Sequence, residues 1–195
     1  MTQTITIADP TLFCAATLCT GKEQTRPYLQ GVFIQPATGG GILLTATDGH
    51  TLFHAHDPAG TTDRAAIVAP DKGKLPAPWA KGGVITIDTA QGVMRHTTGG
   101  LTTGCREVGG TFPDYQRVIP QELSGEVAQF NPALVARFGD IAGILEKGNF
   151  PGIAWNGDGP ALVTFARRDC FGVMMPFRKQ SWIDTTRPTL PTAAA

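Results

Sequence analysis

One segment pattern recurs three times along this chain, with a period of about 60 residues, and this repeat constrains the fold more than any single motif. Each copy opens with a short strand-like stretch, continues with a helical segment and ends with three further strand-like runs. The repeats cover residues 1–60, 61–120 and 121–178. The order βαβββ, found three times, predicts an α+β fold in which helices lie on one face of antiparallel sheets.

The first repeat contains two strong local signals. Asp9-Pro10, after the strand-like run Thr4–Ala8, places a capping side chain and a proline where a helix begins. Asp48-Gly49, between the runs Ile42–Thr47 and Leu52–His56, is a typical hairpin turn. These signals predict a leading strand, a short helix and a hairpin that follows one further strand.

The third repeat has the clearest helix. A predicted strand, Gly125–Phe130, precedes Asn131-Pro132, which again joins a capping residue to a proline at the first helical position. Apolar residues then recur on one helical face up to Gly148-Asn149, where the helix is expected to end. The apolar residues of that face are Leu134, Val135, Phe138, Ile141, Ala142 and Leu145. The strands expected after the helix are Ile153–Trp155, Ala161–Arg167 and Cys170–Met175.

The second repeat is expected to lack a full helix. Its helical segment, Asp71–Lys81, contains one glycine and two prolines, and an interior proline costs roughly 3 kcal/mol. We therefore expect one or two turns, with Leu75 and Trp79 packed inward. The strands expected in this repeat are Ala65–Ala69, Val84–Asp88, Gly92–His96 and Leu101–Val108.

The connector Thr111–Pro120 (TFPDYQRVIP) has no helical or strand period, yet it carries several large apolar and aromatic side chains. Its two prolines remove backbone donors, so the segment cannot extend a sheet. Its apolar side chains must therefore pack on another part of the chain. Two interpretations stay open: an inter-domain connector packed on its own core, or the floor of a groove for a partner.

Composition excludes several classes of function. Lys plus Arg and Asp plus Glu number 16 each, so no overall field attracts nucleic acid or an anionic membrane, and such binding needs a local arrangement. Cys14, Cys19, Cys105 and Cys170 show neither metal-binding nor disulfide spacing and are expected to be buried thiols. No stretch has the character of a membrane span or a signal peptide. We expect a soluble, cytoplasmic protein without membrane association, metal or cofactor.

Catalysis is not expected. Asp48 and His50 resemble a dyad, but no serine or cysteine nucleophile stands in a recognisable elbow, and the Asp-Gly turn already accounts for Asp48. His54 and His56 share one face of a predicted strand with no third metal ligand nearby. The glycines at 39–41 lack the lysine and the helix of a nucleotide-binding loop.

Three motifs occur in the order and near the spacing of one known family. The first motif is RPYLQGVFI at Arg26–Ile34 followed by ATDGH at Ala46–His50. The second is FPDYQRVIP at Phe112–Pro120, and the third is VMMPFR at Val173–Arg178. They resemble the bacterial DNA sliding clamp, the β subunit of DNA polymerase III. The resemblance covers most of residues 1–178 and matches the second domain and the C-terminal half of the third.

The resemblance implies the DNA-clamp fold, a ring of βαβββ units with helices lining a central hole. It implies that residues 1–60 and 61–120 form one clamp domain, that 121–178 form half of another, and that 179–195 form a flexible tail. It also implies a groove between the two domains that binds short peptides of polymerases and repair proteins. The residues at matching positions are Leu29, Thr47, Gly49, His50, Leu52, Pro113, Arg117, Val118, Val173, Met174, Met175, Pro176, Phe177 and Arg178.

The chain departs from the family because it has fewer units and a second helix broken by proline. One hypothesis is a homo-oligomeric ring around double-stranded DNA, a tetramer if the family's ring size is kept, with a clamp loader as a further partner. The alternative is a decoy or adaptor that captures clamp-binding peptides without encircling DNA. A third idea is that the tail, through Trp182-Ile183, occupies a groove. Basic residues that could face DNA, or equally a solvated surface, are Lys22, Arg26, Lys72, Lys74, Lys81, Arg137 and Lys147.

Overall fold

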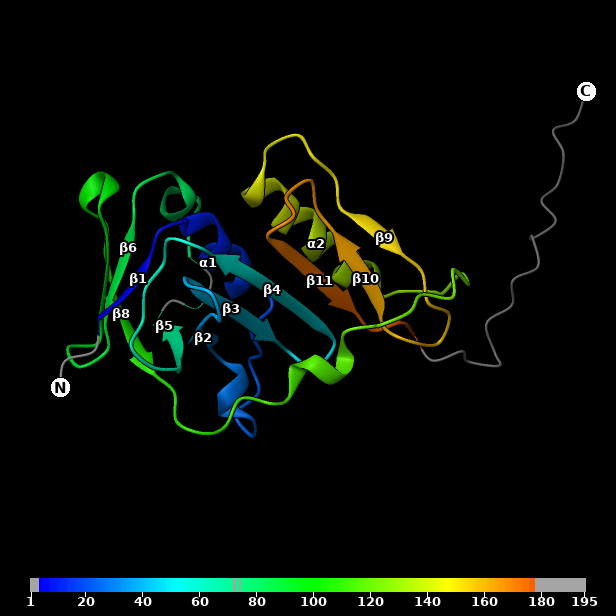
Figure 1. The fold of residues 1–195 in the computed structure, drawn as a ribbon, viewed down its shortest axis with the longest axis horizontal. Coiled ribbons are helices and arrows are strands. Elements are labelled where there is room, and N and C mark those ends of the chain that lie inside the picture. Colours follow the sequence, from blue (N-terminus) through cyan, green and yellow to red (C-terminus); the bar gives the residue numbers. More distant parts are fainter. Residues whose placement is uncertain (1–3, 72, 74, 178–195) are drawn as a thin grey trace, which may run out of the picture.

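The computed structural model describes residues 4–71, 73 and 75–177 (Figure 1). Within these residues eleven strands form one sheet, in the order β1-β6-β7-β8-β5-β2-β3-β4-β11-β10-β9, and neighbouring strands run antiparallel. The predicted α+β class is confirmed.

The strands are β1 (Thr4–Ile7), β2 (Val32–Pro36), β3 (Ile42–Thr47), β4 (Thr51–Asp57), β5 (Ala66–Pro70), β6 (Ile85–Asp88), β7 (Val93–His96), β8 (Thr102–Glu107), β9 (Gly152–Ala154), β10 (Ala161–Thr164) and β11 (Cys170–Met174). The α-helices are α1 (Pro10–Thr17) and α2 (Pro132–Leu145), and the 3-10 helices are η1 (Pro27–Leu29), η2 (Ala77–Ala80), η3 (Thr98–Gly100) and η4 (Tyr115–Val118).

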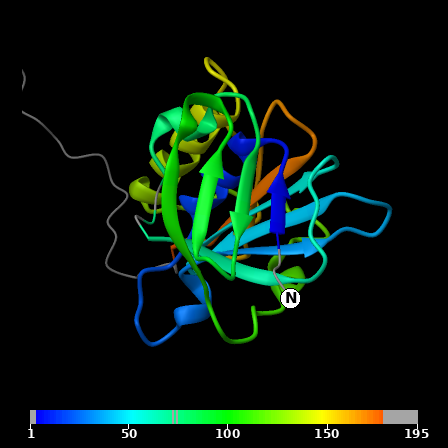
Figure 2. The same ribbon diagram turned by 90° about the vertical axis from the view of Figure 1, so that its left-hand side faces the viewer.

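The first two repeats exchange their leading strands. β1, which opens the first repeat, pairs with β6 of the second, so that Ile5 lies opposite Ile87. β5, which opens the second repeat, pairs in turn with β2 of the first. Two backbone hydrogen bonds also join Thr6 to Thr61, which follows β4. Figure 2 shows β1 (blue) beside the green strands of the second repeat, and neither repeat completes its sheet alone.

The third repeat joins the first through one strand pair. β11 lies antiparallel to β4, with Val173 opposite Leu52. Because side chains alternate along a strand, this pair faces one side of the sheet, while Met174 and Phe53 lie in the main core on the other side. The β4–β11 junction therefore contributes side chains to both faces.

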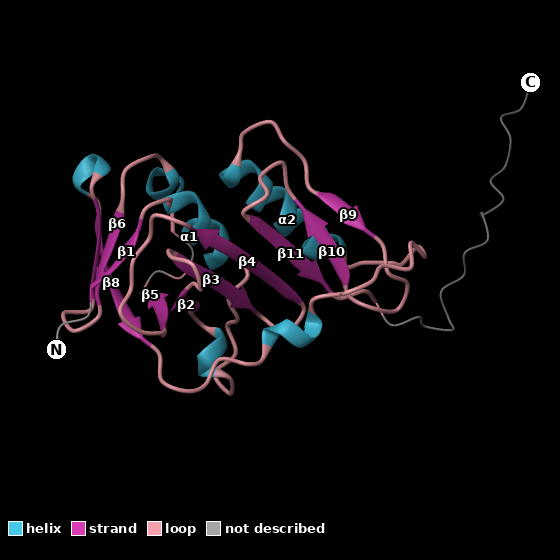
Figure 3. Ribbon diagram, viewed as in Figure 1, coloured by secondary structure: helices cyan, strands magenta, loops and turns pink. Residues whose placement is uncertain are grey.

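The two faces of the sheet are covered differently. The main core lies between the sheet and the helices α1 and α2, which Figure 3 shows together on one side of the strands. A smaller cluster on the opposite face is centred on Leu52, Ile67, Phe112, Tyr115 and Val173. The connector is thus packed on the face that the α-helices leave open.

Both α-helices begin where the capping residues predict. The Asp9 side chain accepts a hydrogen bond from the amide of Thr11 at 3.0 Å, and the Asn131 side chain accepts one from the amide of Ala133 at 3.0 Å. α1 is buried along almost its whole length, including every residue from Leu12 onward. It is a core helix with no broad solvent-exposed face.

One helix and one strand differ from a regular repeat. The helical segment of the second repeat is reduced to η2, as its prolines predict, and Leu75 and Trp79 are buried. The predicted strand Gly125–Phe130 is wrong for the described structure, because no strand pairs along it. Its first residues instead form two backbone hydrogen bonds with the end of β9 and the turn after it. The amide of Gly125 donates to the carbonyl of Trp155, and the amide of Gly157 donates to the carbonyl of Glu126.

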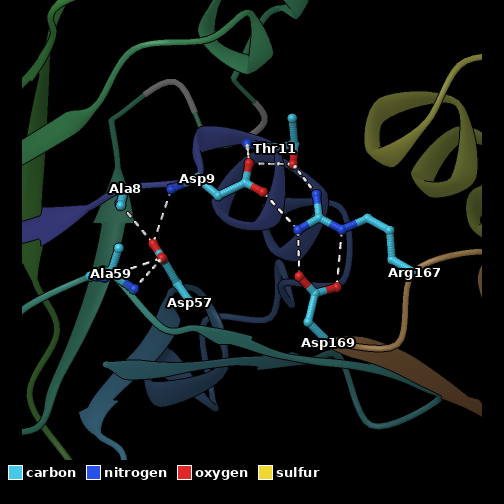
Figure 4. Close-up of polar contacts among 8 residues, drawn as sticks. Ala8, Asp9, Thr11, Asp57, Ala59, Arg167 and Asp169 are labelled. Carbon is cyan, nitrogen blue, oxygen red and sulfur yellow. Dashed lines mark hydrogen bonds and ion pairs between the residues drawn. The ribbon is translucent and has the colours of Figure 1, made fainter. Parts of the chain in front are cut away.

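Arg167, between β10 and β11, ties the third repeat to the start of α1 (Figure 4). Its guanidinium forms ion pairs with Asp9 at 2.7 Å and with Asp169, and it donates to the hydroxyl of Thr11 at 3.1 Å. The hydrogen bond from Arg167 lowers the pKa of the Asp169 carboxyl. Asp57 accepts from two amides at the start of α1, at 2.7 and 3.0 Å. A polar network therefore holds the first and third repeats in register.

The four cysteines are buried, as predicted, and they are free thiols in the structure. Burial raises the pKa of Cys14, Cys19 and Cys170 to about 12 and that of Cys105 to about 11, so these thiols stay protonated. Among the described residues no helix has the length and apolar character needed to cross a membrane. The predicted tail at 179–195 lies outside the described residues.

Candidate functional site

A groove opens on the face opposite α1 and α2, over the junction of β4 and β11. Its cavity volume is about 210 Å³. This is smaller than the roughly 300–1,000 Å³ of a typical small-molecule pocket, so the groove has room for a few side chains. Four parts of the chain form it: the loop before β2, the β3–β4 hairpin, the connector and the end of β11. The lining residues are Arg26, Tyr28, Leu29, Thr47, Gly49, His50, Thr51, Leu52, Pro113, Asp114, Tyr115, Val118, Val173 and Met175.

The connector packs on the sheet and borders the groove at the same time. The ring of Phe112 stacks on Phe33 of β2 with the ring centroids 4.8 Å apart, and the Tyr115 hydroxyl accepts a hydrogen bond from Gln35 at 3.1 Å. Val118, on the same connector, is 39% exposed at the groove. The two interpretations of this segment are therefore compatible, because different side chains serve the packing and the groove.

The hairpin that borders the groove is held by its own side chains. The Thr47 hydroxyl donates to the carbonyl of Thr51 at 2.7 Å and accepts from the amide of Gly49 at 3.1 Å. Asp48 Oδ1 accepts from the amides of His50 at 2.9 Å and Thr51 at 2.7 Å. Gly49 has a φ of 89°, a conformation that glycine adopts without strain. The tip is consequently a fixed edge.

Arg137 of α2 braces this hairpin from outside it. Its Nη1 forms an ion pair with Asp48 Oδ2 and donates to the Thr51 hydroxyl at 2.6 Å. Burial by itself raises the pKa of Asp48, but the hydrogen bonds from Arg137 and from two amides outweigh it, and the net shift is downward. The carbonyl of His50 also accepts from the amide of Met175 at 2.9 Å. The hairpin is thus anchored to both α2 and the end of β11.

The floor of the groove is apolar and its edges adapt. Leu29, Leu52 and Val173 are at most 4% exposed, while Val118 and Met175 are more than a third exposed. Apolar side chains of a partner gain roughly 25 cal/mol for each Å² of apolar surface that they bury there. The flexible thioether of Met175 can adjust to partners of different shape.

Polar groups border the apolar floor. Arg26 is ion-paired with Glu23 at 2.7 Å, and its guanidinium lies close to Gly49. Asp114 is ion-paired with Arg117 at 2.9 Å. An apolar centre with charges of both signs at the edge is the composition of a protein-binding surface, in which the edge fixes orientation.

Most of the residues predicted for the groove come together in it. Those that line it are Leu29, Thr47, Gly49, His50, Leu52, Pro113, Val118, Val173 and Met175. Met174 does not, because it alternates with its neighbours along β11 and is fully buried in the main core. Arg117 points into solvent, with its side chain 84% exposed.

The last three residues predicted for the groove are at positions 176–178. Pro176 and Phe177 follow β11 without lining the groove, and the amide of Phe177 donates to the carbonyl of Gln129 at 2.7 Å. Arg178 lies outside the described residues. Among residues 4–71, 73 and 75–177, the groove therefore ends at Met175.

Sequence reasoning missed Arg26, Tyr28, Thr51, Asp114 and Tyr115 as lining residues. Thr51 could have been found, because it follows the Asp-Gly turn directly and precedes Leu52, which pairs with Thr47. Asp114 and Tyr115 stand in the quoted motif beside predicted residues, but no local pattern says which side chains of an irregular segment turn toward the sheet. Arg26 was assigned to DNA instead.

The predicted DNA-facing residues differ in their surroundings. Lys22, Lys81 and Lys147 are exposed and make no ion pair within the described residues. Arg26 lies at the groove and Arg137 is bound to Asp48, so neither is a free cation on a helix face. Lys72 and Lys74 lie outside the described residues. The exposed face of α2 adds Asp140 and Glu146, which oppose the charge of Lys147.

Comparison with curated proteins finds bacterial sliding clamps. The β sliding clamp of Pseudomonas aeruginosa is 34% identical over 122 residues, which are 59% of this chain and 31% of that protein. The β sliding clamp of Pseudomonas putida is 31% identical over 137 residues, 68% of this chain and 37% of its own length. The chain thus spans about a third of the length of these relatives. No protein-family model matches the chain.

Solved structures show the same fold. The DNA polymerase III β subunit of P. aeruginosa has a TM-score of 0.63 at 23% identity and is matched over 90% of this chain and 66% of its own. The β subunit of Borrelia burgdorferi, solved in complex with a natural product, has a TM-score of 0.64 at 14% identity over 90% of this chain and 64% of its own. A sliding clamp of Bartonella birtlesii bound to griselimycin has a TM-score of 0.61 at 19% identity over 91% of this chain and 66% of its own.

The antiparallel sheet with α-helices on one face and a groove on the other places the chain in the class of DNA-clamp folds. Within it, the chain is a relative of the bacterial β sliding clamp, the β subunit of DNA polymerase III.

Proposed function

We propose that this chain is a clamp-type docking protein whose groove binds short peptides of DNA polymerases and repair proteins. The groove over the β4–β11 junction carries the proposal, because it has an apolar floor from two repeats and a hydrogen-bonded hairpin as its edge. Clamps of the same fold solved with griselimycin or another natural product support it, since those proteins accept compact ligands.

The chemistry of the groove specifies the peptide. Leucine and phenylalanine side chains fit the floor formed by Leu29, Leu52 and Val173. The Arg26 guanidinium suits a carboxylate or carbonyl of the peptide, because it can donate several hydrogen bonds in one plane. The fixed hairpin reduces the ordering cost of binding.

We further propose that copies of the chain assemble into a ring that encircles double-stranded DNA and tethers the bound polymerase or repair protein. In this proposal residues 1–60 and 61–120 form one clamp domain and 121–178 half of another. The number of repeats in the chain favours a ring of four copies, and a clamp loader would open this ring. Because α1 is buried, contacts with phosphates fall to exposed cations such as Lys81, next to η2, and Lys147, next to α2. Sequence-independent contacts suffice when topology retains the protein.

Peptide affinity tests the groove. A fluorescein-labelled peptide with leucine and phenylalanine anchors is expected to bind, and Met175→Ala to weaken binding by about 1 kcal/mol, roughly fivefold, measured by fluorescence anisotropy. Phe177→Ala is the matched control, since Phe177 is an exposed apolar residue close by that does not line the groove. Equal losses in both variants, or in neither, would contradict the assignment.

Retention on DNA tests the ring. Protein loaded on a nicked circular plasmid should stay bound during gel filtration at moderate salt and be lost once the plasmid is linearised. Loss from both forms, with peptide binding intact, would leave the decoy or adaptor function.

A further inference from the structure

In the third repeat, β9 has a free edge. β2 and β6, the first strands after the helical segment in the other two repeats, are each paired on both sides. β9 pairs only with β10 among the described residues, and Figure 1 shows it as the last strand at the right-hand end of the sheet. A free edge offers backbone donors and acceptors to another strand.

The segment 125–130 has the sequence position of a leading strand but forms no strand pair among the described residues. Val127 and Ile5 occupy equivalent positions, because each lies four residues before the capping residue of its helix. Ile5 is fully buried in β1, whereas Val127 is 80% exposed. The same position is a core residue in the first repeat and a surface residue in the third.

Both ends of this segment are held within its own repeat. The amide of Gly125 donates to the carbonyl of Trp155 at 3.1 Å, and the carbonyl of Glu126 accepts from the amide of Gly157, in the turn after β9, at 2.8 Å. The carbonyl of Gln129 accepts from the amide of Phe177, just after the last strand of the repeat, at 2.7 Å. In the first repeat Thr6, which is equivalent to Ala128, forms its two backbone bonds with Thr61, also just after the last strand. The segment therefore lies beside the end of its own last strand, as β1 does, but one residue out of register with β1.

The middle of the segment has free backbone donors. None of the described residues forms a hydrogen bond with the amides of Val127 or Ala128. Leu123, before the segment, is 41% exposed, and Phe150, before β9, is 88% exposed. Free backbone groups with exposed apolar side chains beside them are typical of an interaction surface.

We propose that two copies of this chain pair through their third repeats by exchanging the segment 125–130, as the first and second repeats do within one chain. The segment of one copy lies along β9 of the other, and the reverse contact completes a two-fold dimer. A second copy is the occupant because β9 needs the leading strand of another repeat, and β1 and β5 are already paired within the chain. The contact is self-complementary, as a two-fold interface requires.

This interface is distinct from the groove over the β4–β11 junction and goes beyond peptide docking. It places the third repeat in a composite domain built from two chains. The same rule of reciprocal strand exchange then holds for every repeat described. Peptide binding and dimer formation can fail independently, so their tests remain separate.

The mass of the full chain in solution tests the dimer. Sedimentation velocity over a concentration series should give twice the chain mass of 20.6 kDa, or a larger oligomer built from this dimer. Val127→Lys places a charge on the exchanged strand and should raise the dissociation constant of this contact at least about tenfold. Val135→Lys is the matched control, because Val135 is an exposed valine of the same repeat on α2, and this variant should associate like the parent.

Complementation identifies the two sides of the contact. Ile153→Glu, in β9, should also weaken the dimer, but an equimolar mixture with Val127→Lys should restore it. In the mixed dimer one contact joins lysine to glutamate and the other is unchanged. Circular dichroism and peptide affinity report whether each variant is folded, and Val127→Lys should keep the parent's peptide affinity. A parent chain that stays monomeric at all concentrations, or association unaffected by Val127→Lys, would overturn the proposal.

Discussion

The junction between the first and second repeats differs in kind from the junction between the first and third. The former consists of exchanged strands, with fully buried side chains such as Ile5 and Val68. The latter consists of one strand pair, β4 with β11, and the packing of α1 against α2 in the main core, and it is reinforced by the ion pairs of Arg167 and Arg137.

This difference has a functional meaning, because the groove lies over the second junction and not over the first. The stability of an apolar junction made of exchanged strands is sensitive mainly to substitutions that remove side-chain volume. A junction that depends on ionised groups and on one partly buried histidine, His54, responds to pH and to charge. The groove for the proposed partner therefore lies over the junction whose stability depends more on pH and charge.

The largest expected effect is at the junction made of exchanged strands. Ile5→Ala should reduce the free energy of unfolding by roughly 3 kcal/mol, because it removes buried volume from β1 where β6 cannot close the gap. Urea denaturation measures the change. Val127→Ala, at the equivalent position of the third repeat, should stay within about 0.5 kcal/mol in dilute, monomeric protein. Equal losses would show that the two leading segments are packed alike.

Acid should weaken the second junction through His54. This residue lies opposite Phe171 across β4 and β11, with the rings 5.2 Å apart, and burial with a smaller effect of His56 lowers the pKa of His54 to about 4. The unfolded chain takes up the proton first as the pH falls. The contribution of His54 is therefore complete above about pH 6.5 and is lost progressively toward pH 4, by up to roughly 3 kcal/mol.

Urea denaturation at pH 7 and pH 5 measures this contribution. His54→Gln should flatten the part of the pH dependence that His54 causes, while His56→Gln should leave it in place. A parent-like slope in His54→Gln would assign the acid sensitivity to other groups.

A smaller effect is expected from the polar network. Arg167→Met leaves Asp9 and Asp169 without their shared cation and should cost about 1–2 kcal/mol, an amount reduced by the partial exposure of the pair. Hydrogen exchange should rise in β10 and β11 before it rises in β6. Arg64→Met, which removes an exposed pair with Glu107 between β5 and β8, should cause no measurable change.

Local signals predicted the elements that local chemistry determines. The two capping residues set the starts of α1 and α2, the Asp-Gly pair set the β3–β4 turn, and prolines reduced the second helix to η2. The groove followed from motifs that the structure brings together. Alternation along β11 could also have excluded Met174, since Val173 and Met175 must share the other side.

Nonlocal pairing could not be predicted in this way. The alternating pattern of β1 indicates a strand but not that its partner, β6, belongs to another repeat. The same limit made Gly125–Phe130 a predicted strand, because its pattern is that of a strand whose partner the chain does not supply among the described residues. Arg137 resembled a cation on an exposed helix face, and only the three-dimensional fold brings Asp48 to it.

β4 pairs on both sides, with β3 and β11, and its alternating side chains serve both faces of the sheet. Phe53 and Ala55 fill the main core, while Leu52 lies under the groove. No substitution in this strand can therefore alter one face without risk to the other. Variation in ligand preference has more room at the exposed edge of the groove, where Val118 and Met175 are each more than a third exposed. In a lineage of such proteins, β4 should diverge slowly and these exposed edge positions faster.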